Sequence, residues 1–305
     1  MKIELLNRQQ IDEAKWNMCI EQSGFDRVNA QVWYLDIVAK EWQALVLNDY
    51  DALMPLAIKQ RWGIRYITLP DWSQQLGIFS RVVLHSDTIH LFYQRIPYVF
   101  RHLQVNSRSN PDQTIACSQQ LPNCELMLCH DKATLMHQFS QNTKRNVRKS
   151  AACELSMPLE NHANEFLTFM DQWARFECSP TQRELLRQII SDAIARNCGW
   201  IEKACSQTGE VLAMVFFLKS KNRIVYHTSV SSPQGYDSCA TYAIVNHIIR
   251  QYAGSGLILD FEGSRIDGIK RFFEGFGAVD CPYYSLKPAM NFSFVSKLIR
   301  GIGRF

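Results

Sequence analysis

The chain has 305 residues, of which 47% are hydrophobic and 20% are charged. This composition is typical of globular proteins and excludes a disordered or fibrous chain, while the length suits two domains of about 150 residues. The formal net charge of +4 is compatible with an anionic ligand, but it lacks the concentrated positive charge expected of a dedicated nucleic-acid-binding protein.

No segment approaches the roughly 20 apolar residues needed to span a bilayer, and residues 1–8 lack the apolar core of a signal peptide. We therefore expect a cytoplasmic protein whose ten cysteines are reduced thiols. The tightest group of potential metal ligands is Cys124, Cys129 and His130. No second pair has the spacing of a zinc site, so no metal is predicted.

The first half of the chain predicts helices and short strands. Helical spacing of apolar residues, and apolar runs separated by the Asn48-Asp49 turn, give the order of these elements. The predicted helices are 11–22, 31–41 and 87–95, and the predicted strands are 43–47, 52–59, 65–69, 98–106 and 124–130.

A loop rich in proline, tryptophan and glutamine occupies residues 70–80. Loops held by a rigid scaffold often carry polar and aromatic groups for ligand recognition. The candidates for such a role here are Asp71, Trp72, Gln74 and Gln75. The alternative is a loop that packs between domains.

In the second half, Ser179 followed by Pro180 is typical of a helix start, and the helix is expected to end at Gly199. Three apolar runs joined by tight turns then predict an antiparallel meander. Helix–strand alternation follows the meander. The predicted strands are 200–205, 211–219, 224–230, 257–261 and 281–286, and the predicted helices are 238–253 and 268–276.

A meander that continues into helix–strand alternation predicts a mixed, mostly antiparallel sheet flanked by helices, which is an α+β (mixed α/β) fold. Both halves run through helices, meander, loop, helix and strand. We therefore expect a tandem duplication of one fold, although no repeat is evident residue by residue.

Two carboxylates end the predicted strand 257–261. Asp260 and Glu262 are expected to point the same way because side chains alternate along a strand. Ligands of open α/β sheets bind at such strand ends, so either residue is a candidate general base. The structural alternatives are that Asp260 caps the following turn and that Glu262 pairs with Arg265.

Residues 142–149 predict a helix with one strongly basic face. Lys144, Arg145, Arg148 and Lys149 are spaced at i, i+1, i+4 and i+5 and share that face. The face is a candidate for binding phosphate groups, and an ordinary solvated surface is the alternative.

The chain resembles the FemABX-like branch of the GNAT acyltransferases, in which two GNAT-like domains occur in tandem. The resembling segments are the basic helix 142–149, the loop 74–80, and residues 259–264 followed by 272–278. The resemblance implies a first domain over residues 1–130 on the acceptor side and a second over 131–288 on the donor side. Residues 289–305 then form a basic amphipathic tail.

Membership of that family implies transfer of an acyl or aminoacyl group to an amine, from acyl-CoA or a charged tRNA. The donor loop is matched by residues 234–240, which contain one glycine instead of the glycine-rich loop of ordinary GNAT enzymes. A helix start after a strand can also hold pyrophosphate through its free N–H groups. The candidate donor-binding residues are Gly235, Ser238, Cys239, Ala240 and Thr241, with a helix capped by Ser238 as the alternative.

Tyr226 and His227 are adjacent on the predicted central strand and should face opposite sides, so one of them is expected near the cleft. Catalysis is expected to be direct attack of an acceptor amine on a thioester or ester carbonyl held between the domains, with backbone N–H groups stabilising the oxyanion. The expected acceptor is a small-molecule or peptide amine. The basic tail is a candidate for peripheral membrane contact.

Two other functions remain open from the sequence. One is an aminoacyl-tRNA-dependent transferase that acts on a peptidoglycan precursor and therefore binds tRNA. The other is a non-catalytic protein that binds an envelope or polysaccharide precursor, which the single glycine of the donor loop favours.

Overall fold

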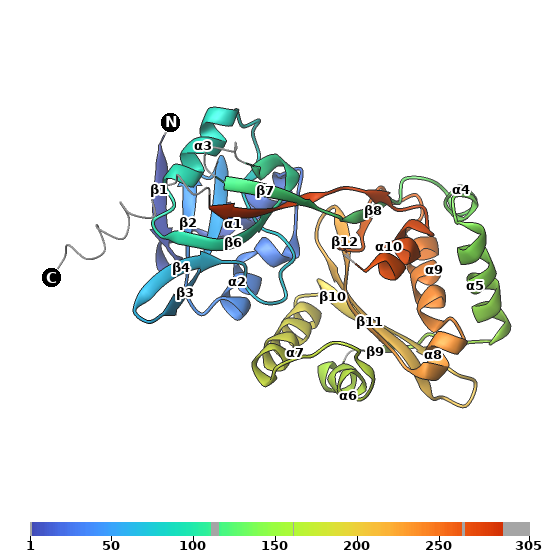
Figure 1. Cartoon of the computed structure of the whole chain (residues 1–305). Coiled ribbons are helices and arrows are strands. Elements are labelled where there is room, and N and C mark those ends of the chain that lie inside the picture. The colour runs from blue at the N-terminus through green and yellow to red at the C-terminus, as the bar shows by residue number, and fades with distance from the viewer. Residues whose placement is uncertain (1, 111–115, 161, 264–265, 289–305) are drawn as a thin grey trace. The chain divides into compact units, whose positions relative to one another are not determined.

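The computed structural model describes residues 2–110, 116–160, 162–263 and 266–288, without the side chains of residues 99–102, 116, 117, 160 and 288. The chain forms two compact units (Figure 1). The first takes the residues up to Leu121 and the segment from Pro282 onward, and the second takes Pro122–Cys281.

The first unit is built on an eight-stranded sheet with the order β1-β2-β3-β4-β6-β15-β7, to which β5 adds by pairing with β3. Its strands are β1 (Ile3–Asn7), β2 (Trp42–Leu47), β3 (Ala52–Arg61), β4 (Ile64–Thr68), β5 (Phe79–Ser80), β6 (Val99–Val105), β7 (Ala116–Leu121) and β15 (Tyr283–Pro288). Its helices are α1 (Glu13–Gln22), α2 (Val32–Val38) and α3 (Ser86–Gln94), with short 3₁₀ turns at Arg8–Gln10, Val28–Ala30 and Ser107–Ser109.

Alternation along β2 explains how this sheet buries both faces. Leu45 and Leu47 belong to the core that includes Phe92 of α3. Ala44 and Val46 belong to a second core that includes Trp16 of α1 and residues of α2. Because successive side chains point to opposite faces, a nearly continuous apolar strand is expected when helices cover both sides.

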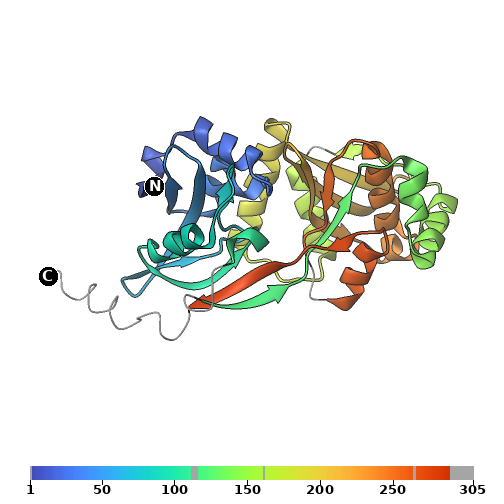
Figure 2. The ribbon, with the colours of Figure 1, turned by 90° about the horizontal axis from the view of Figure 1, so that it is seen from above.

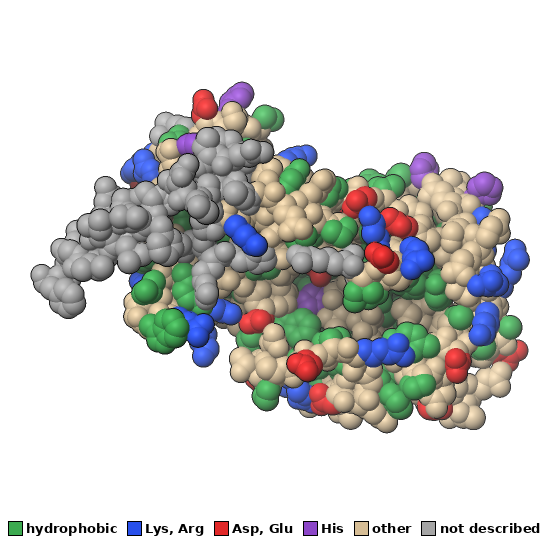
Figure 3. Space-filling view, viewed as in Figure 1, with side chains coloured by type: hydrophobic (Ala, Val, Ile, Leu, Met, Phe, Trp, Pro, Cys, Tyr) green, Lys and Arg blue, Asp and Glu red, His purple; other side chains and the backbone are tan. Residues whose placement is uncertain are grey.

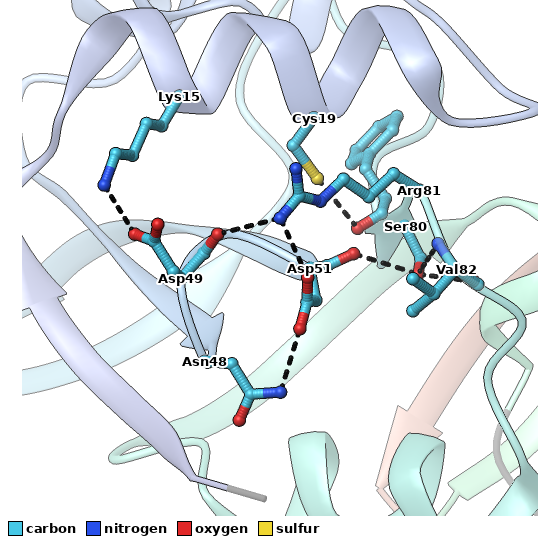
Figure 4. A network of polar contacts seen from close by, with 9 residues as sticks. Lys15, Cys19, Asn48, Asp49, Asp51, Ser80, Arg81 and Val82 are labelled. Atoms are coloured by element: carbon cyan, nitrogen blue, oxygen red, sulfur yellow. Dashed lines mark hydrogen bonds and ion pairs between the residues drawn. The ribbon is translucent and has the colours of Figure 1, made fainter.

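A polar network ties α1 to the β2–β3 turn and to the segment after β5 (Figure 4). Lys15 Nζ contacts Asp49 Oδ1 at 2.7 Å, and Arg81 Nη2 donates to Asp51 Oδ1 at 2.9 Å. Asn48 donates to the other oxygen of Asp51. These hydrogen bonds from Asn48 and Arg81 lower the pKa of the Asp51 carboxyl.

The second unit is built on a seven-stranded sheet with the order β14-β8-β13-β12-β11-β10-β9. Its strands are β8 (Cys124–Met127), β9 (Leu159–Glu160), β10 (Gly199–Cys205), β11 (Val211–Lys219), β12 (Arg223–Ser231), β13 (Ile258–Asp260) and β14 (Val279–Asp280). Its helices are α4 (Lys132–His137), α5 (Gln141–Ala152), α6 (Ala163–Trp173), α7 (Pro180–Ala195), α8 (Pro233–Asp237), α9 (Ala240–Tyr252) and α10 (Asp267–Glu274).

Helices cover both faces of this second sheet. In Figures 1 and 2, α6 and α7 lie together on one face, whereas α9 and α10 lie on the other with α5 packed outside α9. The core on the α9 face joins side chains of β11, β12 and β13 to those of α9 and α10. The predicted α+β architecture, a mixed and mostly antiparallel sheet flanked by helices, is confirmed.

The predicted helix start at Ser179 is also found. Ser179 and Gln182 form a capping box, with Pro180 at the first helical position. The helix ends at Ala195, before the expected Gly199, which instead begins β10. The short strands β1, β5, β7, β9 and β14 were not predicted, because two- to six-residue strands carry little periodic signal.

The two units repeat one topology. In the first, β2-β3-β4 form a meander, α3 follows, and β6 pairs parallel with β4. In the second, β10-β11-β12 form a meander, α9 follows after the short α8, and β13 pairs parallel with β12.

The boundaries of the two units fall after Leu121 and after Cys281, whereas the sequence predicted residues 130 and 288, because two strands pair in the sheet of the other unit. β8 directly follows β7 in sequence, yet it pairs with β13 and β14 in the second sheet. β15 follows β14, yet it lies between β6 and β7 in the first sheet. The chain therefore passes between the units twice, after Leu121 and after Cys281. The tail 289–305 lies outside the described residues.

Candidate functional site

The parallel strands β12 and β13 separate soon after they begin. They pair only where Arg223–Val225 meets Ile258–Asp260, whereas β12 continues to Ser231. On its other edge, β12 pairs with β11 through a bulge that makes His227 an extra residue, because Phe216 faces Thr228 and Phe217 faces Tyr226. Bulges increase local twist and often occur beside functional sites. Because the pairing of β12 with β13 ends at Val225, the backbone of β12 beyond that residue makes no ladder hydrogen bonds to β13.

A pocket of about 330 Å³ lies beside this separated part of β12. Its lining is contributed by β12, by the segment around α8, by the first turn of α9 and by α10. The residues are Tyr226, Ser229, Val230, Ser231, Gly235, Tyr236, Cys239, Thr241, Tyr242, Gly268, Ile269, Phe272 and Phe273. The structure therefore brings together four of the residues singled out from the sequence, namely Tyr226, Gly235, Cys239 and Thr241.

Aromatic side chains make the apolar wall of this pocket. Tyr226 meets Phe273 edge to face at 5.7 Å between ring centroids, and Tyr242 meets Phe272 in the same way at 4.7 Å. Phe273 also stacks on Phe261 at 4.7 Å. Such contacts add to the free energy of burial and hold the rings in fixed orientations.

Ser238 does not cap α9, and this corrects the sequence interpretation. A separate short helix, α8, precedes α9, and the Ser238 hydroxyl donates back to the carbonyl oxygen of Gln234 at 2.8 Å. The residue before α9 is Cys239, which has a left-handed φ of +56° and whose side chain makes no capping hydrogen bond. Among the described residues, no acceptor receives the backbone N–H groups of Ala240, Thr241 and Tyr242.

The basic residues of α5 make different contacts. Lys144 Nζ donates to the carbonyl oxygen of His137 at 2.9 Å and so ties α5 to the end of α4. Arg145 and Lys149 lie near enough to the start of α9 to act on Cys239. Burial raises the pKa of the Cys239 thiol, and these two cations oppose that shift. Arg148 is exposed on the same helix and forms no ion pair among the residues described.

Gly235 is required for packing and does not offer a free amide. A Cβ atom at this position would lie 2.0 Å from the carbonyl oxygen of Leu212 on β11. The Gly235 N–H already donates to the Ser232 hydroxyl at 3.1 Å, as part of the cap of α8. Gly235 therefore lets α8 pack closely against β11, and it forms part of the pocket wall.

Asp260 lies in a buried ion pair. Its side chain is fully buried, and Arg223 Nη1 donates to Asp260 Oδ2 at 2.7 Å and to Glu125 Oε1 at 2.6 Å. Asp260 Oδ1 also accepts the Glu262 N–H at 2.9 Å, which is the turn-capping role proposed as the structural alternative. A carboxylate enclosed by these donors is poorly placed to take a proton from a substrate.

Glu262 does not extend the strand as predicted. β13 ends at Asp260, and Glu262 has a left-handed φ of +51°, so the expected alternation of side chains stops before it. The suggested partner Arg265 lies outside the described residues. Glu262 is half-buried and is not among the residues that line the pocket.

Tyr226 and His227 face opposite sides of the sheet, as expected. Tyr226 is buried on the α9 side and lines the pocket, and burial raises the pKa of its phenol. The His227 ring meets Phe216 edge to face at 5.4 Å, and its Nδ1 lies 2.7 Å from the Thr228 hydroxyl. Of the two, Tyr226 is the one beside the pocket.

In the first unit, the parallel strands β4 and β6 also separate, but a segment of the same unit fills the space between them. Past the pairing of β4 with β6, Leu76 bonds in parallel fashion to β6, donating to the carbonyl oxygen of Gln104 at 2.9 Å. Asn106 and Ser109 side chains secure the carbonyl oxygen of Ile78. The loop 70–80, which was predicted to bind a ligand, therefore pairs with β6 at the position where β12 of the second unit has no partner strand on its β13 side.

The four candidates in this loop have structural contacts. Gln75 is buried, and its amide donates to Gln74 Oε1 at 2.8 Å. The Trp72 carbonyl oxygen accepts the Tyr34 hydroxyl, and Asp71 lies 3.5 Å from Lys59 Nζ. These contacts fix the loop, and whether it also binds a ligand stays a prediction.

Two buried ionisable residues of the second unit were not singled out from the sequence, Arg223 and Glu202. The sequence carries little signal for either, because Arg223 is the first residue of β12 and Glu202 stands next to Lys203 in β10. Glu202 is buried on β10, where its Oε1 accepts the Trp200 indole N–H at 2.9 Å. Burial raises the pKa of its carboxyl.

Glu202 is expected to make stability depend on pH. Because its pKa is higher in the folded than in the unfolded chain, the folded state binds more protons, and stability falls as pH rises above about 4.5. Glu202→Gln keeps a hydrogen-bond acceptor for Trp200 without the charge. The variant should melt at a higher temperature than the wild type at pH 7.5, with a smaller difference at pH 4.5. Glu210→Gln, at an exposed turn, is the control, and equal pH profiles for wild type and Glu202→Gln would contradict the expectation.

Within the described residues, no group of histidine, cysteine or acidic side chains is arranged to hold a metal ion. The described helices are all too short or too polar to cross a membrane. The cysteines whose side chains are described are free thiols.

No protein-family model matches the chain, and no curated protein sequence does either. Solved structures are similar along nearly its whole length. A crystal structure of FemX has a TM-score of 0.68 at 8% identity, covering 98% of this chain and 100% of that one. The chain has a FemX-like fold.

Two further structures extend this likeness. The FemX-like fold is shared with L-PGS from Bacillus licheniformis, at a TM-score of 0.57 and 13% identity, covering 96% of this chain and 98% of that one. An acetyltransferase of the GNAT family from Colwellia psychrerythraea has a TM-score of 0.54 at 10% identity, covering 94% and 99%. The GNAT-like architecture predicted from the sequence is therefore confirmed.

Proposed function

We propose that the second unit binds an acyl donor and transfers its acyl or aminoacyl group to an amine. The observation that carries this proposal is the pocket where β12 leaves β13, because it joins an aromatic cavity to the uncapped start of α9. The cavity suits an acyl chain and its carbonyl group. The start of α9 suits the phosphates of the donor.

The electrostatics of the α9 start favour an anion. A helix N-terminus carries a partial positive charge, and its free N–H groups bind phosphate oxygens without any charged side chain. Ala240 and Thr241 begin the helix directly after Cys239, and Arg145 and Lys149 add two cations from α5. Phosphates on CoA or at the end of a charged tRNA meet these requirements, and no metal is part of the proposed chemistry.

The proposed reaction is direct aminolysis. The amine nitrogen attacks the carbonyl carbon of a thioester or ester, a C–N bond forms, and the C–S or C–O bond breaks. Backbone N–H groups on the unpaired edge of β12 are available to stabilise the oxyanion. Tyr226 lines the pocket, and burial raises the pKa of its phenol, which therefore stays protonated. It is placed to pass its proton to the departing thiolate or alkoxide and to take up the proton that the amine nitrogen loses, so that the net transfer runs from the amine to the leaving group.

The Cys239 thiol is not required as a covalent nucleophile. Burial raises its pKa, so the thiol form predominates near neutral pH. This supports direct transfer over a covalent acyl-enzyme.

The acceptor is proposed to be an amine of a cell-envelope precursor or of a peptide in the cytoplasm. The FemX-like fold, shared with L-PGS, supports an envelope role. A charged tRNA as donor is the second candidate, because the exposed basic face of α5 would suit an RNA backbone. A non-catalytic protein that binds such a precursor is the third. Membrane contact through the tail 289–305 remains part of this proposal.

Thermal unfolding with acetyl-CoA, CoA and charged tRNA in parallel tests the donor site. A ligand at a hundred times its Kd should stabilise the protein by about 2.7 kcal/mol. Arg145→Gln combined with Lys149→Gln removes two charge-assisted contacts of about 1.5–3 kcal/mol each, so donor affinity should fall at least about 100-fold. The control combines Lys221→Gln, in the β11–β12 turn, with Arg250→Gln, near the C-terminal end of α9. It makes the same change in charge away from the pocket and should leave donor affinity unchanged.

Each outcome separates the candidates. Stabilisation by CoA that the Arg145/Lys149 variant abolishes supports the proposed donor. Stabilisation by charged tRNA alone favours the tRNA-dependent enzyme, and no stabilisation by any donor favours the binding protein. CoA binding that the Arg145/Lys149 variant leaves intact would place the donor elsewhere.

A further inference from the structure

The hairpin formed by β3 and β4 projects from the first unit as an exposed basic and apolar tip. All residues from Lys59 to Ile64 are exposed, although the preceding part of β3 is buried. The segment 59–67 contains Lys59, Arg61 and Arg65 and no acidic residue. Figure 3 shows hydrophobic and basic side chains together at this end of β3 and β4.

The pairing of the two strands sorts these residues onto faces. Lys59 is opposite Tyr66 and Arg61 is opposite Ile64, so these side chains share one face of the hairpin. The other face carries Ile58 and Ile67, which are buried in the core of the first unit. The outward face therefore combines two cations with an isoleucine that is 60% exposed.

Trp62 lies at the turn and is 85% exposed. The Arg61 guanidinium lies over its ring, 4.3 Å from the centroid. Trp62 and Gly63 both have left-handed φ values, +51° and +78°. Such a two-residue turn favours asparagine or aspartate before the glycine, and a bulky residue with positive φ costs stability. The tryptophan thus brings conformational cost without burial, so folding does not account for it.

Arg61 is available to an external anion. Lys59 is 3.5 Å from Asp71, and Arg65 pairs with Glu41. In the part of the chain that the structure describes, Arg61 makes no ion pair. A cation, a tryptophan and an isoleucine therefore reach into solvent at one point.

We propose that the tip Arg61–Ile64 inserts into the interface of an anionic lipid membrane. Tryptophan is favoured at the boundary between headgroups and acyl chains, because its ring is apolar and its N–H is polar. Ile64 adds apolar area below that level, and Arg61 faces the lipid phosphates. The surface differs from the donor pocket and does not depend on the proposed transferase activity.

Lipid fits this tip better than RNA or another protein. RNA contact would use the cations and the tryptophan ring but would leave Ile64 exposed to water. A protein partner would be expected to meet a broader apolar surface than one turn of a hairpin provides. The tip is small and convex, which suits penetration of a soft interface.

Binding of the full chain to vesicles tests the proposal. Vesicles of phosphatidylcholine with and without 30% phosphatidylglycerol, about the content that gives a clearly negative surface, are mixed with protein and sedimented. Trp62→Asn should weaken binding to the anionic vesicles at least about tenfold. Arg61→Gln should weaken it about fivefold, and added salt should reduce binding of the wild type. Trp62→Asn should melt no lower than the wild type, because asparagine tolerates left-handed φ.

Matched variants locate the effect. Val83→Ser removes another highly exposed apolar side chain of the same unit, beyond the opposite end of β3, and should bind as the wild type does. A variant with Lys297, Arg300 and Arg304 changed to glutamine isolates the basic tail. Brominated lipids should quench tryptophan fluorescence in the wild type and in this tail variant more than in Trp62→Asn.

The proposal is overturned if Trp62→Asn binds vesicles as tightly as the wild type, if Val83→Ser weakens binding equally, or if quenching does not depend on Trp62. It is equally overturned if Trp62→Asn leaves vesicle binding intact but abolishes binding to tRNA.

Discussion

Asp260→Ala is expected to lower the free energy of unfolding of the second unit by about 3–4 kcal/mol, a large part of the stability of an ordinary domain. Asp260 and Arg223 are both buried, and the substitution removes one of the two carboxylates that Arg223 contacts. Glu125 remains, which keeps the loss toward the lower end of the range for a broken buried ion pair. The turn also loses the acceptor for the Glu262 N–H.

Chemical denaturation followed by circular dichroism measures this change, with Glu210→Ala at an exposed turn as the control. Asp260→Asn separates structure from catalysis, because it removes the charge while nearly keeping the shape. If Asp260 positions the strand end, both variants lose stability together with activity. An Asp260→Asn protein with wild-type stability and no turnover would instead support a catalytic base at this position.

Gly235→Ala is expected to destabilise the second unit by about 2–3 kcal/mol and to weaken donor binding, because the methyl group would overlap the carbonyl oxygen of Leu212. That oxygen also accepts the Ser232 N–H at 2.9 Å, so α8 would have to move away from β11 and distort the pocket. Thermal unfolding and donor titration would report the two effects together.

Gly268 offers a matched comparison, since it lines the same pocket but a methyl group added to it would meet no other atom within 4 Å. Gly268→Ala lies in the first turn of α10 and should stabilise the protein by about 0.5 kcal/mol through backbone entropy. Equal melting temperatures for the two variants would show that the close approach of α8 to β11 is dispensable.

The meander in each half and the long helices followed from short-range pattern. Val211–Lys219 was predicted with the bounds that β11 has, because nine residues that are nearly all apolar stand between two turns. The start of α7 followed from Ser179 and Pro180. These features depend on neighbours within about four residues, which a sequence displays directly.

The start of α9 could not be predicted from the neighbouring residues alone. Ser238 is a good capping residue by type, and nothing nearby in sequence excludes that role. The short helix α8 ends at Asp237, and the Ser238 hydroxyl donates to the carbonyl oxygen of Gln234 in that helix. Cys239 is therefore the residue before α9, in a left-handed conformation. The uncapped helix start, on which the proposed donor site depends, results from this competition.

The sequence by itself determined the longer helices and strands, their order and the duplicated α+β architecture, since hydrophobic periodicity and turn residues act over a few positions. Tertiary structure alone decided that Asp260 pairs with Arg223, 37 residues away, and that Arg223 reaches Glu125 across 98 residues. It also decided that β8 and β15 exchange sheets, and that Leu76 fills in the first unit the gap left open in the second. Each depends on contacts between distant segments, whose free energy has no counterpart in local pattern.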